Sequence, residues 1–180
     1  MIDGIYEFTY RPVAEKRPAA VVFGIIMAMS LVIVIASESA EKYKGVISLA
    51  AVILICAAIY IFVRFLASDY AYILIFDNNG LPNLIVTKTV GKSVTTLFTA
   101  LITDIQDIKA ESPEERKKHR TPSGTKKYNY TVSLIPGTVY RVYTSGKEGK
   151  SEILMEFNEA VRERLLEYSA IARAYEIDGE

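Results

Sequence analysis

Two long uncharged apolar segments near the amino terminus constrain this chain most. The first runs from Pro18 to Ser37, and the second from Gly45 to Val63, where Arg64 ends it. Each has about twenty residues, the length at which an α-helix crosses a hydrocarbon core of about 30 Å. A core helix of a soluble domain would carry a polar stripe, and neither segment has one. We therefore predict a transmembrane helical hairpin over residues 18–66, with spans at 18–37 and 45–66.

A cleaved signal peptide is the main alternative for the first segment. The apolar run follows a polar lead of residues 1–17 and exceeds the apolar region of about 7–15 residues found in signal peptides. The stretch Ser37–Ala40 is also a poor cleavage pattern. These features favour a membrane anchor.

The charges beside the two spans predict their orientation. The link of residues 38–44 is too short to hold a domain, so both termini lie on one side of the membrane. The terminal side carries more basic residues than the link: Arg11, Lys16, Arg17 and Arg64 against Lys42 and Lys44. This bias predicts a multi-pass protein with both termini in the cytoplasm and residues 1–17 as a cytoplasmic lead. Four tyrosines are expected to anchor at headgroup level: Tyr43, Tyr60, Tyr70 and Tyr72.

Small residues recur every four positions in the first span, at Ala20, Gly24 and Ala28. This pattern lets two helix backbones approach closely. We expect this face to pack within the hairpin, and a homo-oligomer formed through it is the alternative. The single cysteine, Cys56, is expected to be an apolar packing residue of the second span.

From residue 70 onward the pattern changes to that of short strands. Runs rich in β-branched and aromatic residues alternate with turn signals. The predicted strands cover residues 70–76, 84–90, 93–98, 101–110, 128–134, 139–144 and 152–156, with a further short strand in the lead at 4–10. The spacing of three between Ile102, Ile105 and Ile108 would equally suit a helical turn. Residues 111–127 lack apolar periodicity and are predicted to form a long loop.

The last segment, residues 158–176, has helical spacing. Asn158 is a good N-cap for it. Its apolar stripe consists of Val161, Leu165, Tyr168, Ala172 and Tyr175. A helix of this kind that follows antiparallel strands must bury its stripe on the sheet or across an open barrel end.

This order of elements resembles a bacterial pleckstrin-homology-like (PH-like) or YcxB-like two-span membrane protein. The resemblance rests on the turn Asp77–Gly80, the segment Leu101–Ile108 with its Leu-x-x-Asp-Ile-x-x-Ile pattern, and the closing helix. The families commonly carry tryptophan where this chain has Thr103. The resemblance implies an α+β protein of the bacterial inner membrane. Residues 70–180 would form a cytoplasmic PH-like domain, a seven-stranded antiparallel sheet or barrel capped by a C-terminal α-helix.

Two basic features bear on lipid binding. PH domains that bind phosphoinositides resemble one another in a basic loop between their first two strands, whereas residues 77–83 carry no lysine or arginine. The basic residues lie instead in the predicted loop: Arg116, Lys117, Lys118, Arg120, Lys126 and Lys127. Near a membrane this loop would attract anionic headgroups, and the alternative is a solvated surface loop.

The sequence offers few candidate catalytic residues. His119 is the only histidine and is expected to be exposed to solvent, while strand alternation points Asp104 and Asp107 to opposite faces. No metal-ligand spacing, phosphate-binding glycine loop or nucleophile motif is present in the sequence. We therefore expect no enzymatic activity, no cofactor and no metal. The chain carries 21 basic and 21 acidic residues, so nothing predicts nucleic acid binding.

The sequence thus predicts a membrane-tethered PH-like interaction or scaffolding module that binds a protein partner at the cytoplasmic face. The alternative is a lipid-sensing or regulatory membrane protein that uses residues 116–127 on anionic headgroups.

Overall fold

The computed structural model of the chain describes residues 8–39, 41–76, 81–146 and 149–178. The chain divides into two compact units. A helical unit contains residues 14–68 together with 133–135, and a β-rich unit contains the described residues up to 13, then 69–132 and those from 136 onward.

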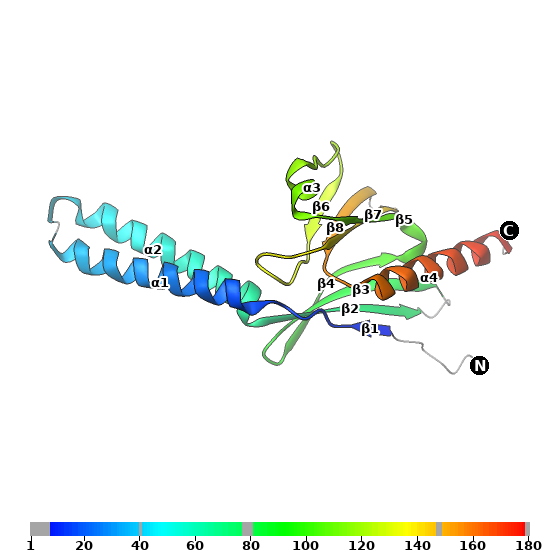
Figure 1. Cartoon of the computed structure of the whole chain (residues 1–180), viewed down its shortest axis with the longest axis horizontal. Coiled ribbons are helices and arrows are strands. Elements are labelled where there is room, and N and C mark those ends of the chain that lie inside the picture. The colour runs from blue at the N-terminus through cyan, green and yellow to red at the C-terminus, as the bar shows by residue number, and fades with distance from the viewer. Residues whose placement is uncertain (1–7, 40, 77–80, 147–148, 179–180) are drawn as a thin grey trace. The chain divides into compact units, whose positions relative to one another are not determined.

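The helical unit is built from two helices that run side by side (Figure 1). Helix α1 covers Lys16–Ser39, and α2 covers Lys44–Ile61 after a short 3-10 turn, η1, at Glu41–Tyr43. A π-helical turn, η2, extends α2 over Phe62–Leu66. Both helices are long and apolar enough to cross a membrane, and only 11% of each segment is buried. The core helix of a soluble domain would be mostly covered, so the outward apolar surface fits two spans.

The buried side chains of α1 and α2 are small or hydroxylated. Ala19, Ala51 and Ala58 are almost fully buried. The hydroxyls of Ser30 and Ser37 donate to the carbonyl oxygens of Met27 and Val34, at 2.8 and 2.6 Å. Because these hydroxyls find acceptors in their own helix, they need no water, which suits an apolar environment.

The predicted packing of Ala20, Gly24 and Ala28 within the hairpin is wrong. All three residues are exposed, and a Cβ at Gly24 would meet nothing within 4 Å. The buried positions of α1 are instead Ala19, Ser30 and Ser37, at spacings of eleven and then seven residues. Eleven is the sum of a four-residue and a seven-residue step, and such steps are those of left-handed helix packing. Oligomerisation through the small face stays a prediction.

The first sheet of the β-rich unit has the order β1-β2-β3-β4. Its strands are β1 Phe8–Tyr10, β2 Ser68–Phe76, β3 Pro82–Val90 and β4 Ser93–Leu101. β1 pairs antiparallel with β2, as β3 does with β4. The predicted turn Asp77–Gly80 lies outside the described residues.

The second sheet has the order β5-β7-β8-β6. Its strands are β5 Ile105–Glu111, β6 Lys126–Asn129, β7 Val139–Gly146 and β8 Gly149–Met155. A 3-10 turn, η3, at Ile102–Asp104 leads from β4 into β5, so the predicted strand 101–110 is a helical turn followed by a strand. Helix α3, Pro113–Lys118, lies in the connection from β5 to β6, and helix α4, Glu159–Asp178, closes the chain (Figure 1).

The described residues thus form eight strands in two sheets, not one seven-stranded antiparallel sheet or closed barrel. The lead adds β1, and β6 pairs parallel with β8. β6 is also shorter than predicted because the Asn129 side chain accepts hydrogen bonds from the backbone N–H and the hydroxyl of Thr131, at 3.0 and 2.8 Å. Such a local turn competes with continued strand pairing.

Tyr72 links the two sheets. Its hydroxyl donates to the carbonyl of Tyr130 at 2.9 Å and accepts from the backbone N–H of Glu156 at 3.2 Å. Burial raises the pKa of this phenol. Tyr70 and Tyr72 are 3% and 1% exposed, so the prediction that they anchor in lipid headgroups is wrong; they are core residues of the β-rich unit.

Helix α4 follows the predicted pattern. The Asn158 side chain accepts from the N–H of Val161 at 3.0 Å, which confirms the N-cap. Val161, Leu165 and Ala172 are buried. The ring centroids of Tyr168 and of Phe76 in β2 lie 5.6 Å apart, so the apolar stripe of α4 covers the first sheet. The side chain of Tyr175 lies outside the described part of the chain.

Candidate functional site

Three charged side chains are buried on one face of the second sheet. Glu111 ends β5, Arg141 lies in β7 and Glu152 in β8. Glu111 is paired with Val139 and Glu152 with Tyr143. Both of these β7 residues lie two positions from Arg141. Because side chains alternate along a strand, all three project from the same face.

Arg141 bonds to both carboxylates. Its Nε and Nη2 donate to the two oxygens of Glu111 at 2.6 and 2.7 Å, and its Nη1 donates to Oε2 of Glu152 at 2.8 Å. Arg141 is 1% exposed and Glu152 is fully buried. Burial on its own would lower the pKa of Arg141, but the hydrogen bonds and charge of Glu111, with the charge of Glu152, raise it. The guanidinium therefore stays charged.

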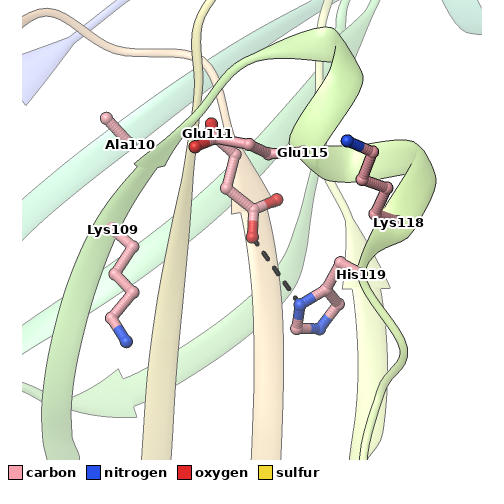
Figure 2. A pocket seen from close by; sticks show the side chains of 6 residues that line it. All are labelled: Lys109, Ala110, Glu111, Glu115, Lys118 and His119. Carbon is pink, nitrogen blue, oxygen red and sulfur yellow. Dashed lines mark ion pairs between the residues drawn. The ribbon is translucent and has the colours of Figure 1, made fainter.

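Two residues that follow α3 complete this buried cluster. His119 Nε2 lies 3.1 Å from Oε2 of Glu152. Its Nδ1 lies 3.8 Å from Oε1 of Glu111 (Figure 2). The Thr121 hydroxyl donates to Glu152 at 3.0 Å. Burial would raise the pKa of Glu152, yet the hydrogen bonds from Thr121 and His119 and the charge of Arg141 hold it below its ordinary value. We call these five residues the buried charge cluster.

The surroundings of His119 differ from the prediction. It is half-buried against two glutamates rather than exposed in a loop. Residues 113–118 form α3, whose start is a capping box: Ser112 accepts from the N–H of Glu115, and the Glu115 carboxylate accepts from the N–H of Ser112. The motif Ser-Pro-Glu-Glu was a readable signal for this helix, and it was missed.

Sequence reasoning also missed Glu111, Arg141 and Glu152. The available signal was a charged residue among strand residues that are otherwise apolar, as in Val139-Tyr140-Arg141-Val142. Such a residue must find a partner when the strand is buried. The sequence does not say which partner, because that depends on the register of β5, β7 and β8.

A hollow of about 340 Å³ lies beside the cluster, lined by Lys109, Ala110, Glu111, Glu115, Lys118 and His119 (Figure 2). Most of the charged side chains that line it already have ion-pair or hydrogen-bond partners. Lys109 pairs with Asp107 at 3.3 Å, and Glu111 is held by Arg141. Among the described residues no group of three His, Cys, Asp or Glu side chains could hold a metal ion. The cluster's contacts tie three strands to the segment after α3, which is a structural role.

The predicted lipid-binding residues separate into two groups. The Arg116 guanidinium turns inward and donates to the carbonyl oxygens of Pro136 and Gly137 at 2.8 and 3.0 Å. The other five are exposed: Lys117, Lys118, Arg120, Lys126 and Lys127. We call these five the exposed cations. They lie on α3, on β6 and in the connection between them.

A protein-family model described as Bacterial PH-like domain (DUF6106) matches residues 7–172. The chain belongs to this family. No curated protein and no solved structure matches the chain. The DUF6106 match includes both apolar helices as well as the sheets and most of α4, so the two units form one family architecture. This confirms the PH-like resemblance.

One sheet edge of this DUF6106 domain is long and open. β4 is the last strand of the first sheet, and its residues 93–96 are exposed. Val94 is 65% exposed although it is apolar. The inner half of the strand is covered, since the Tyr130 hydroxyl donates to the Leu97 carbonyl at 3.1 Å and Phe98 contacts Tyr128 and Tyr130. The outer half of β4 is therefore a surface on which another strand could pair.

Proposed function

We propose that this protein is a non-enzymatic interaction module tethered to the bacterial inner membrane. Helices α1 and α2 span the bilayer and hold the PH-like domain at the cytoplasmic face. The domain binds a protein partner by adding one of the partner's strands to β4. The observation that carries this proposal is the exposed outer half of β4 at the open edge of the first sheet.

The hairpin geometry identifies the backbone groups that a partner would use. Val90 and Ser93 face each other across a two-residue turn, Gly91-Lys92, with φ 59° at Gly91, the position that a type II′ turn reserves for glycine. The residues that flank such a turn are a hydrogen-bonded pair, so the next pair, Thr89 and Val94, is not. The N–H and C=O of Val94 therefore point away from β3. Main-chain hydrogen bonds of this kind supply the affinity in strand addition.

The non-enzymatic part of the proposal is supported by how the polar groups of the domain are used. Both buried carboxylates are bonded to Arg141, and His119 and Thr121 bond to one of them. No described nucleophile lies in this cluster with a free base beside it. PH-like folds serve many functions, so the family alone does not decide this point.

A proline at Val94 tests strand addition with little change to the fold. Val94→Pro removes an outward N–H that the β3–β4 ladder does not use, whereas Val94→Thr changes only the side chain. The full chain would carry a photo-crosslinking residue at Thr95 in native membranes. We expect a discrete crosslinked protein band with Val94→Thr and its loss with Val94→Pro. An unchanged band with Val94→Pro would reject strand addition at β4.

Anionic lipid binding is a second candidate, favoured by the exposed cations. Each basic residue near an anionic membrane contributes about 1 kcal/mol, so five could contribute several kcal/mol at low salt. Native mass spectrometry of the full chain in mixed anionic and neutral lipid tests this. Replacing all five cations by glutamine should abolish retention of the anionic lipid. Equal retention by the neutralised chain would reject this function without touching the β4 proposal.

A further inference from the structure

Three residues of the connection from β6 to β7 group with the helical unit rather than with the strands. They are Ser133, Leu134 and Ile135. Ser133 is 6% exposed, and its hydroxyl accepts a hydrogen bond from the backbone N–H of Glu15 at 3.2 Å. Glu15 immediately precedes Lys16, the first residue of α1. The three-residue segment therefore lies beside the start of the first apolar helix.

The same end of the hairpin contains the end of the second helix. Lys16 Nζ donates to the carbonyl oxygen of Leu66, the last residue of η2, at 3.2 Å. Arg17 is exposed one residue further on. Long basic side chains at the ends of a span lie where the hydrocarbon gives way to the headgroups. If α1 and α2 span the bilayer, residues 133–135 lie at this level.

The side chains of the segment suit that position. Ile135 is 67% exposed and Leu134 is half-buried. A single exposed apolar residue is ordinary on a soluble surface. Beside the start of the proposed membrane span, however, Ile135 would have an apolar phase next to it, and transfer of its side chain into that phase is favourable.

We propose that Leu134 and Ile135 form a membrane-contacting loop, with the Ile135 side chain inserted among the headgroups and upper acyl chains of the bilayer. This inference rests on the proposed membrane hairpin. The loop lies between two strands of the second sheet, so its insertion fixes the β-rich unit to the bilayer at a point distinct from the two chain connections to α1 and α2.

Depth-dependent quenching of a fluorescent label tests the loop. The full chain would be reconstituted in lipid nanodiscs of phosphatidylcholine and phosphatidylglycerol, in a Cys56→Ala background that removes its only cysteine. An environment-sensitive label would be attached in turn through Ile135→Cys, Val94→Cys and Leu31→Cys. These three sites have similar exposure, 67%, 65% and 61%, so the substitutions disturb packing equally little. The quencher would be a lipid that carries a nitroxide near the headgroup or near the chain end.

We expect the label at position 135 to be quenched most by the shallow nitroxide, with blue-shifted emission, and more strongly than the label at position 94. The label at position 31 should be quenched by the deep nitroxide, since it reports on the hairpin itself. This inference alone would be overturned if the label at position 31 is quenched but the label at position 135 emits as in water. The same holds if the label at position 135 is quenched no more strongly than the label at position 94. Absence of quenching at position 31 would overturn the proposed membrane hairpin and the inference with it.

Discussion

Replacing Arg141 by methionine should destabilise the β-rich unit severely and in a pH-dependent way. The substitution keeps an unbranched apolar stem and removes the charge that bonds to Glu111 and Glu152. The carboxylates would be left close together, 10% and 1% exposed. Removing one partner of a buried ion pair typically costs about 3–5 kcal/mol.

The size of this loss can be bounded from the chemistry of the carboxylates. The variant can relieve the repulsion by protonating one glutamate. Starting from the ordinary pKa of 4.5, protonation at pH 7 costs about 3.4 kcal/mol, at about 1.36 kcal/mol per pH unit. The loss of stability should therefore shrink by about 2.7 kcal/mol between pH 7 and pH 5. In the unsubstituted chain the pKa of Glu152 is lowered, so its contribution persists at pH 5.

Urea unfolding of the full chain in detergent micelles provides the measurement. Near-ultraviolet circular dichroism would follow the packed tyrosines of the β-rich unit, such as Tyr72 and Tyr140. The matched control removes all three charges through Arg141→Met, Glu111→Leu and Glu152→Leu, and should regain most of the lost stability. A loss below about 1 kcal/mol at pH 7 for Arg141→Met, or one that does not change with pH, would refute the reasoning.

Three further predictions concern single contacts. A Cβ at Gly146 would clash with the carboxylate of Asp104. Gly146→Ala should therefore destabilise by about 1–3 kcal/mol, and by less in an Asp104→Ala background, as a double-mutant cycle of thermal melts would measure. Ser112→Ala removes one half of the capping box and should cost about 1 kcal/mol, with faster amide exchange confined to α3; unchanged exchange would contradict it. Acidification should lower the free energy of unfolding as the pH falls through the depressed pKa of Glu152. Glu152→Gln should flatten this pH dependence. Equal slopes of unfolding free energy against pH in the two chains would contradict the prediction.

Periodicity in the sequence was sufficient for elements whose faces are set by local pattern. The stripe of α4 and its Asn158 cap were predicted because helical spacing alone decides which side is buried. The hairpin was predicted as two apolar helices from the length of its two uncharged segments. Its internal face was not, because a helix that is apolar on all sides does not encode which side meets its neighbour. Ala19 rather than Ala20 is buried, a rotation of one residue that only the tertiary packing of the helices decides.

The buried charge cluster could not be predicted from the sequence, for a different reason. Glu111, Arg141 and Glu152 come together only through the registers of β5 with β7 and of β7 with β8, and a slip of one residue would send Arg141 to the other face. Long-range pairing of this kind leaves no local signal of which charged residues become partners. The capping box at Ser112 was in contrast a local signal, and the high charge of the segment obscured it.

The contacts on either side of the exposed cations bear on what those cations can bind. Before them, Arg116 is held by the carbonyls of Pro136 and Gly137, and among them His119 and Thr121 are held by Glu152. The segment is therefore fixed to the sheet at several points. A fixed segment loses less conformational entropy on binding than a flexible loop, so the same five charges would bind an anionic surface more tightly. Arg116 also fixes the chain at Pro136 and Gly137, immediately after Ile135, so its guanidinium restrains the loop that we propose to enter the bilayer.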